Sequence, residues 1–248
     1  DGFQCPLADQ LMGATAENLA EEFSISREEQ DSYAVETQRR CQQAREENLF
    51  ADEIAPVEIP GRKGPTVISV DEHPRDNSNM ASMAKLKPVF KKEGTVHAGN
   101  SSGITDGACA LVLANEEVAK AEGWPILAVV GASARGGVEP RRMGMGPVPA
   151  IGKLLTQTGA SISDYDLVEI NEAFAAQVLA CLKEVDIDRD RLNVHGGSIA
   201  LGHPIGATGA RIVTTLIHAA KRRGGGKGMA SLCISGGMGL ALDLEISS

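Results

Sequence analysis

The second half of the chain alternates between short apolar runs and helical patterns, and this alternation constrains the fold more than any other feature. Strands that alternate with helices are typical of an α/β layer architecture. The strands are expected at residues 126–131, 167–170, 192–194, 229–234 and 240–246, and the helices at 149–158, 173–184 and 207–223. No internal repeat is visible, and the length suits one large domain or two small ones.

The first part of the chain is more polar and less regular. Ser26 and Glu29 have the spacing of a capping box, which predicts a long helix from this point to about Glu47. The other elements expected here are a helix at 14–23, short strands at 54–59 and 67–70, loop with brief helix over 71–103, an apolar strand at 108–114 and a short helix that ends near residue 121.

Composition excludes several classes of protein. The 248 residues include 24 Lys and Arg against 33 Asp and Glu, for a net charge of −9, and only 3% are aromatic. Nucleic-acid binding usually needs clustered cations and aromatic platforms, so this chain is a poor candidate for it. No run of 18 apolar residues is present, and we therefore expect no transmembrane helix. The chain does not begin with Met or a signal-peptide pattern, and we expect it to start inside a longer gene product.

The cysteines indicate a reducing environment. The five cysteines are an odd number, lie far apart in the sequence and form no Cys-x-x-Cys pair. This pattern argues against a disulfide framework and against a zinc site. We therefore expect a cytoplasmic protein or, in a eukaryote, one of the mitochondrial matrix or the peroxisome, and we expect no metal.

Two glycine-rich loops hold the residues most suited to chemistry. His203 lies between a glycine and a proline just before a helix, and Cys233 lies at the end of an expected strand before another glycine-rich turn. An imidazole and a thiol on loops at one sheet edge can act as an acid–base pair. Asn171 follows the expected strand 167–170, where open α/β sheets bind ligands. A helix N-cap is an equally good interpretation of Asn171.

A serine-hydrolase pattern is also present but lacks its structural context. Residues 99–103 fit Gly-x-Ser-x-Gly, whereas a nucleophile elbow requires a strand before it and a helix after it. Here a turn and a strand are expected to follow, so we set this interpretation aside.

Several motifs in register make the chain resemble one family. Together they resemble the thiolases, the acetyl-CoA acetyltransferases and 3-ketoacyl-CoA thiolases. The motifs lie at residues 12–18, 94–103, 143–149, 171–175, 202–206 and 233–239. The resemblance spans essentially the whole chain and implies a thiolase-like layered α/β fold, with two duplicated halves and a loop domain inserted near the end of the first half. It places the loop domain at 1–102, the last strand and helix of the N-terminal half at 103–124, and the C-terminal domain at 125–248.

The resemblance implies acyl transfer between CoA and a reactive cysteine. His203 matches the histidine that activates the nucleophilic thiol and helps to bind the thioester oxygen. Asn171 matches the asparagine that holds a water in that oxyanion hole, and Cys233 matches the cysteine that moves the proton at C2 of acetyl-CoA. The backbone N–H of Ser235 matches a second oxyanion donor, at a position where the family usually has glycine.

The resemblance also implies a binding site for CoA or acyl-CoA as substrate, with no permanently bound cofactor. Arg75 and Ser82 match positions near the nucleotide, Leu86 and Phe90 positions along its apolar wall, and Ser102, Met143 and Phe174 positions near the pantetheine arm. Nearby lysines such as Lys91 either serve the CoA phosphates or form a solvated face, and both interpretations stay open. Leu11 replaces a histidine found in some biosynthetic members, which weakens an assignment to acetoacetyl-CoA.

The family's nucleophile is a cysteine followed by Ser-Gly, and no cysteine here has that context. We therefore expect the C-terminal two-thirds of a thiolase, which needs a complementary N-terminal chain or segment that supplies the nucleophile. In that case the strand at 108–114 lacks its neighbours. The complete unit is expected to form homo- or hetero-oligomers. Two alternatives are a non-catalytic CoA-binding scaffold subunit and a self-sufficient hydrolase that uses Cys233 and His203.

Overall fold

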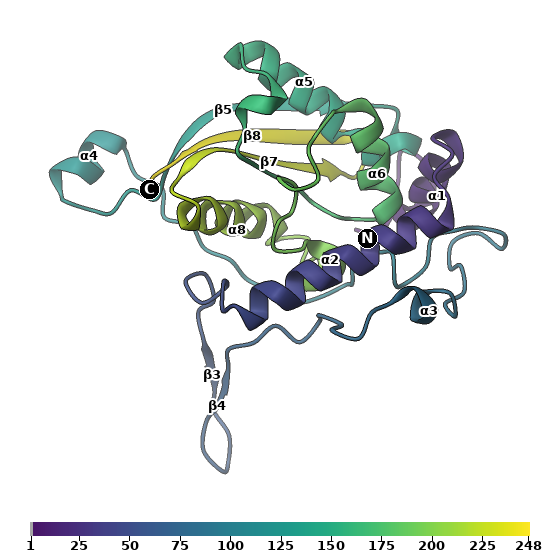
Figure 1. The fold of residues 1–248 in the computed structure, drawn as a ribbon, viewed down its shortest axis with the longest axis horizontal. Helices are drawn as coiled ribbons and strands as arrows, with labels where there is room; N and C mark the ends of the chain where they lie inside the picture. Colours follow the sequence, from purple (N-terminus) through teal and green to yellow (C-terminus); the bar gives the residue numbers. More distant parts are fainter. Residues whose placement is uncertain (1) are drawn as a thin grey trace.

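The computed structural model of the protein describes residues 2–248 and has a four-stranded sheet at its centre (Figure 1). The strand order is β5-β8-β7-β6, formed by β5 (Ala128–Gly137), β6 (Leu167–Ile170), β7 (Gly226–Ile234) and β8 (Met238–Ile246). β6 and β7 run parallel, whereas β8 is antiparallel to both of its neighbours. The expected α/β class is confirmed.

Helices cover both faces of this sheet, because alternate strand residues point to opposite faces. Leu167 and Ala230 pack with α8 (Thr208–Arg222) in one buried cluster. Their neighbours in the two strands, Val168 and Met229, pack instead in a cluster with residues of α5 (Pro147–Thr158) and α6 (Ala175–Glu184) on the other face. Burial on two faces explains why all four residues of β6 are buried.

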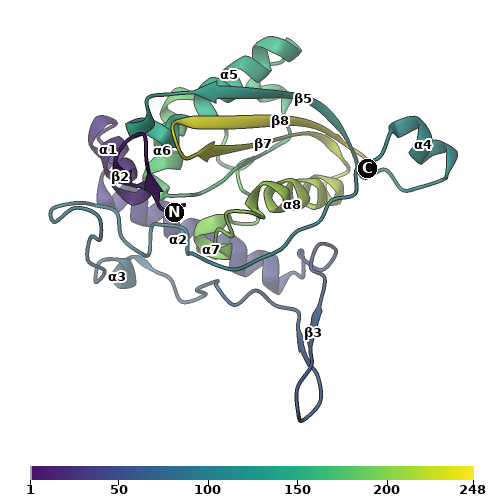
Figure 2. The same cartoon turned by 180° about the vertical axis from the view of Figure 1, so that it is seen from behind.

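The N-terminal part wraps around this layered unit (Figures 1 and 2). The capping box is confirmed, since the Ser26 amide donates to the Glu29 carboxylate over 2.6 Å and the Glu29 amide donates to the Ser26 hydroxyl over 3.2 Å. The elements here are β1 (Gln4–Cys5), β2 (Gln10–Leu11), α1 (Met12–Glu22), α2 (Arg27–Glu46), β3 (Val57–Ile59), β4 (Thr66–Ile68) and α3 (Met80–Met83). The β3–β4 hairpin projects away from the rest of the molecule.

Two expected strands are wrong. Residues 108–114 form no strand, and Val112 is 95% exposed. This segment lies against α8, where the Cys109 thiol is 3.3 Å from the Thr214 hydroxyl. Within residues 2–248 it has no strand to pair with. The segment 103–124 therefore contains the expected helix, α4 (Glu116–Ala121), without the strand. In the other segment, 192–194, Leu192 forms one isolated bridge to Val168.

Five short elements were not expected from the sequence. They are the strands β1 and β2, the 3₁₀ helices η1 (Pro140–Met145) and η2 (Ile162–Asp164) and the helix α7 (Ser198–Leu201). Across residues 2–248, no helix combines the length and the apolar character that crossing a bilayer requires.

One buried carboxylate joins α2 to the α/β layers. Glu172 is fully buried and accepts hydrogen bonds from the Tyr33 hydroxyl at 2.8 Å, the Thr37 hydroxyl at 2.9 Å and the Asn193 amide at 3.0 Å. Burial raises the pKa of Tyr33 well above its usual value, and the charge of Glu172 adds to this effect. The N-terminal part is thus anchored directly beside Asn171.

Candidate active site

Asn171 and Cys233 lie at the same edge of the sheet. β6 ends at Ile170 and its parallel neighbour β7 ends at Ile234. The Asn171 amide N–H donates to the Ser231 carbonyl over 2.9 Å, which ties the two strand ends together. The N-cap interpretation of Asn171 does not hold, because α6 begins at Ala175 and its N-cap is Phe174. The edge is the one where α/β sheets bind ligands.

His203 is held on a tightly packed loop between α7 and α8. Gly202 has a φ of +91°, and a Cβ at this position would lie 2.5 Å from the Thr105 side chain. Only glycine fits that backbone and that approach. The His203 amide N–H then donates to the Gly103 carbonyl over 2.9 Å. The loop geometry thus fixes the backbone position from which the His203 imidazole extends.

The hydrogen bonds around His203 determine which ring nitrogen carries the proton. The Thr208 hydroxyl donates to the Pro204 carbonyl at 2.9 Å and lies 2.6 Å from His203 Nδ1. A hydroxyl has one proton, so Thr208 Oγ1 must accept from Nδ1–H. A neutral imidazole has one N–H, and Nε2 of His203 therefore carries a free lone pair.

A second series of hydrogen bonds leads to that lone pair. Arg211 Nη2 donates to the Ser198 hydroxyl over 2.8 Å, and the Ser198 hydroxyl donates to Asn171 Oδ1 over 2.6 Å. An arginine can only donate, so the direction of this series is fixed. With its oxygen occupied, Asn171 turns its Nδ2 towards His203 Nε2, at 3.4 Å. An amide donor and an imidazole acceptor therefore face each other at the site.

The electrostatics give the two titratable groups opposite roles. Burial, and then the nearby Arg211 charge, lower the pKa of His203 to about 4. Burial raises the pKa of the Cys233 thiol to about 12. At neutral pH the imidazole is therefore uncharged and can accept a proton, whereas the half-buried thiol holds one that it can donate.

Ser235 lies at the turn between β7 and β8, next to a cysteine that the sequence did not single out. The turn needs Gly237, whose φ is +84° and whose Cβ would lie 2.3 Å from the Val138 carbonyl. Cys5 packs against this turn. Burial opposes ionisation of its thiol, but hydrogen bonds from the Ala8, Leu7 and Gly236 backbone and the Ser235 side chain lower its pKa overall. No sequence motif marks this contact.

A cavity of about 680 Å³ lies between α3, the loop 98–104 and α7. Five of the seven residues expected to bind CoA are in its walls: Arg75, Ser82, Leu86, Phe90 and Ser102. His73 and Gln38 line it too, although the sequence gave no reason to select them. Lys91 forms an ion pair with Glu21 at the surface.

The other two expected residues lie behind this wall. Met143 and Phe174 are buried in a cluster with Phe90 and Cys233. The Phe90 and Phe174 rings meet edge to face, with centroids 6.1 Å apart. Met143 and Phe174 therefore pack behind Phe90, and the same cluster connects this part of the wall to the Cys233 side chain.

The inner end of the cavity is tied to the reactive groups. The amide and the hydroxyl of Ser102 both lie 3.0 Å from the Ala173 carbonyl, two residues after Asn171. The neighbouring Gly103 carbonyl accepts the His203 amide. An elongated ligand with an anionic end near Arg75 would therefore bring its other end close to His203 and Asn171.

The fold and this site define an α/β protein whose acid–base groups are joined by hydrogen bonds to Ser102 and Gly103 in the wall of a ligand cavity. The model of the family described as "Thiolase, C-terminal domain" matches residues 124–246, and that of "Thiolase, N-terminal domain" matches residues 1–117. Together they cover nearly the whole chain. The chain belongs to the thiolase family.

Individual relatives agree with this assignment. The acetyl-CoA acetyltransferase of Escherichia coli K12 is 50% identical over 99% of this chain and 62% of its own length. The structure of the Bacillus anthracis acetyl-CoA acetyltransferase has a TM-score of 0.96 at 50% identity, over 98% of this chain and 62% of that one. A human mitochondrial 3-ketoacyl-CoA thiolase in complex with CoA has a TM-score of 0.95 at 44% identity, over 99% and 61%. The chain thus spans about 62% of the length of the curated relatives it matches.

One part of the sequence interpretation is wrong. The chain was expected to lack the N-terminal part of a thiolase, but residues 1–117 match the N-terminal domain. The expectation of a separate complementary chain that supplies the nucleophile consequently has no support from these comparisons.

Proposed function

We propose that the protein is an acyl-CoA C-acyltransferase of the thiolase type, which condenses acetyl-CoA or cleaves 3-ketoacyl-CoA through a cysteine-bound acyl group. The observation that carries this proposal is the His203 Nε2 lone pair, which faces the Asn171 amide beside the cavity wall formed by Ser102 and Gly103. The names of the relatives, acetyl-CoA acetyltransferase and 3-ketoacyl-CoA thiolase, support it.

The chemistry assigns one task to each group. Cleavage next to a thioester carbonyl produces an enolate, which needs hydrogen-bond donors at its oxygen and a proton for its carbon. The Asn171 amide and the Ser235 backbone N–H serve the developing oxyanion. His203, neutral at pH 7, accepts a proton from the attacking thiol. Cys233, protonated at pH 7, gives its proton to C2 in cleavage and is left as a thiolate. Condensation is the reverse step, in which the Cys233 thiolate, not the thiol, removes the proton from C2.

CoA is proposed to bind as substrate in the 680 Å³ cavity. The exposed Arg75 guanidinium and Ser82 suit the anionic nucleotide end, because a guanidinium binds phosphate with paired N–H donors. Leu86 and Phe90 provide apolar wall, and Ser102 lies where the arm approaches the reactive groups. No permanently bound cofactor is required for this chemistry.

The acyl-carrying cysteine is not among the residues assigned here, since none of the five cysteines is directly followed by Ser-Gly. A non-catalytic CoA-binding subunit is the second candidate, because the cavity alone would serve it. A binder, however, has no use for a histidine whose tautomer is fixed on both sides. That feature favours the catalytic proposal over the scaffold.

The test compares His203→Ala with His218→Ala, a histidine on α8 outside the site, in the native protein. Loss of a general base should lower kcat about 10²–10⁴-fold, with the Kd for CoA changed less than threefold. The control should keep wild-type kcat. Binding of CoA without thiolysis or condensation in the wild type would favour the scaffold. Hydrolysis of acyl-CoA that needs no acceptor thiol and is lost on alkylation of Cys233 would favour a hydrolase.

We further propose the domain boundaries 1–102, 103–124 and 125–248 and a homo-oligomeric assembly. The projecting β3–β4 hairpin supports the assembly, since Val57 and Val67 are 59% and 58% exposed and a two-stranded hairpin is marginally stable alone. Sedimentation of the native protein tests the assembly. The five free cysteines suit a reducing compartment, such as the cytoplasm or the mitochondrial matrix.

A further inference from the structure

Two separate pieces of chain form adjoining walls of the proposed CoA cavity. One wall is α3 with the turn after it, and includes Met83 and Leu86. The other wall is the loop 98–103. The walls touch at Gly99, where an added Cβ would lie 2.5 Å from Met83 Sδ and 2.6 Å from Leu86 Cδ1. A small change in their separation therefore changes the shape of the whole cavity.

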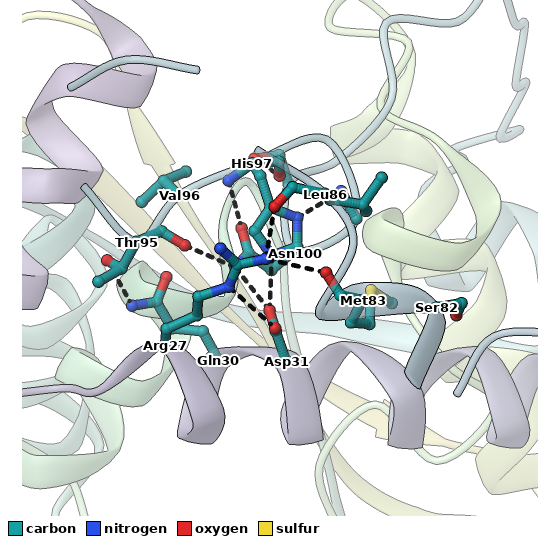
Figure 3. A network of polar contacts seen from close by, with 12 residues as sticks. Arg27, Gln30, Asp31, Ser82, Met83, Leu86, Thr95, Val96, His97 and Asn100 are labelled. Atoms are coloured by element: carbon teal, nitrogen blue, oxygen red, sulfur yellow. Dashed lines mark hydrogen bonds and ion pairs between the residues drawn. The ribbon is translucent and has the colours of Figure 1, made fainter. Parts of the chain in front are cut away.

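Arg27 of α2 holds the first wall from beneath (Figure 3). Its Nη2 donates to the Met83 carbonyl at 2.9 Å and to the Leu86 carbonyl at 2.6 Å. These carbonyls lie at and just after the end of α3, where helical carbonyls lack partners within the helix. The Nε of the same guanidinium lies 3.3 Å from Asp31 Oδ2, one turn further along α2.

Asp31 holds the second wall through its other oxygen (Figure 3). Oδ1 lies 2.7 Å from His97 Nε2 and 2.9 Å from Asn100 Nδ2. His97 is fully buried, and its Nδ1 accepts the Gly99 amide N–H at 3.1 Å. Because Nδ1 accepts, Nε2 carries the proton and donates it to Asp31.

We propose that Arg27, Asp31 and His97 form a brace, buried at Asp31 and His97, that fixes the two walls at the separation CoA requires. None of the three lines the cavity, so each is a positioning residue that acts through Met83, Leu86 and the 98–103 loop. Their ion pair and hydrogen bonds join residues up to 69 positions apart in the sequence. The inference rests on the proposed function only in taking CoA as the ligand.

Asp31→Asn tests the brace, because three donors converge on this side chain: Arg27 Nε, His97 Nε2 and Asn100 Nδ2. An asparagine offers one acceptor oxygen and an NH₂ that must face one of these donors. The matched control is Glu36→Gln on the same helix. Glu36 pairs with Arg39 and Arg40 at 2.8 Å on the outer side, and hydrogen bonds from Arg39 lower its pKa to about 2.

The experiment measures the Kd for CoA by calorimetry, kcat and KM for CoA, and circular dichroism of the native protein. We expect Asp31→Asn to raise Kd and KM for CoA at least tenfold and to change kcat less than threefold at saturation. Glu36→Gln should leave Kd within twofold of wild type. Arg27→Lys is the milder second variant. It keeps the charge but lacks the guanidinium fork, and we expect a three- to tenfold rise in Kd.

The outcomes separate the brace from the proposed function. If either folded brace variant binds CoA within twofold of wild type, the brace is wrong and the proposed function stands. Equal losses of affinity in Asp31→Asn and Glu36→Gln would also overturn the brace, because they would reflect general destabilisation. If wild-type protein binds no CoA, the proposed function fails and the brace fails with it.

Discussion

Ser198→Ala removes a hydroxyl that is fully buried and touches no cavity wall. Asn171 Oδ1 then loses its donor in a site where Asn171 is only 1% exposed. Leaving one buried acceptor unpaired costs about 1–3 kcal/mol. The cost falls on the amide orientation that turns Nδ2 towards His203, because the Ser198 hydroxyl is the donor that Oδ1 has in that orientation. Since about 1.4 kcal/mol is tenfold in rate, we expect kcat to fall about 10- to 100-fold.

The assay is steady-state thiolysis and condensation, with the Kd for CoA measured in parallel. Ser231→Ala is the matched control, since Ser231 is equally buried and its hydroxyl donates to the Leu240 carbonyl over 2.8 Å within the sheet. Both variants should melt at slightly lower temperature. A kcat for Ser198→Ala within twofold of the control would refute the argument that Ser198 orients the Asn171 amide.

Three other predictions test different parts of the structure. Thr208→Val removes the acceptor of His203 Nδ1–H and should lower kcat at least tenfold, whereas Thr208→Ser should keep most of it. Burial lowers the pKa of His195 from 6.5 to about 4, so between these pH values the unfolded chain binds a proton that the native protein does not. The contribution of His195 to the free energy of unfolding is therefore constant above pH 6.5 and falls by about 3 kcal/mol as the pH is lowered to 4. Urea unfolding of His195→Asn should accordingly depend less on pH in this range than unfolding of the wild type. Leu216→Ala in the α8 core, where Leu216 is 1% exposed, should cost about 2–5 kcal/mol by the same unfolding assay.

Several structural features could be predicted from local sequence patterns. The Ser26–Glu29 box was readable because both partners lie within one turn. The strand 167–170 was found at its observed bounds, since burial on two faces favours a nearly continuous apolar run, which only Glu169 interrupts here. The loop histidine could be singled out because glycine next to it signals a backbone that few residues adopt.

Features that depend on distant partners were not readable in the same way. The apolar segment 108–114 has strand composition, but pairing depends on a neighbour that sequence pattern does not specify. Met143 and Phe174 were expected near the pantetheine arm, and the structure places both in a buried cluster with Phe90, a contact that the sequence does not specify. The contact of Asp31 with His97 links a helix to a loop 66 residues away, and nothing in the local sequence around either residue predicts the other as its partner.

The central claim is that His203 is a neutral base whose Nε2 lone pair faces the Asn171 amide. Nitrogen-15 NMR of imidazole-labelled native protein, titrated from pH 8 to pH 4 and assigned with His203→Ala, measures it most directly. We predict a proton on Nδ1, an unprotonated Nε2 and a His203 pKa near 4. A proton on Nε2, or a His203 pKa at or above 6.5, would contradict the account.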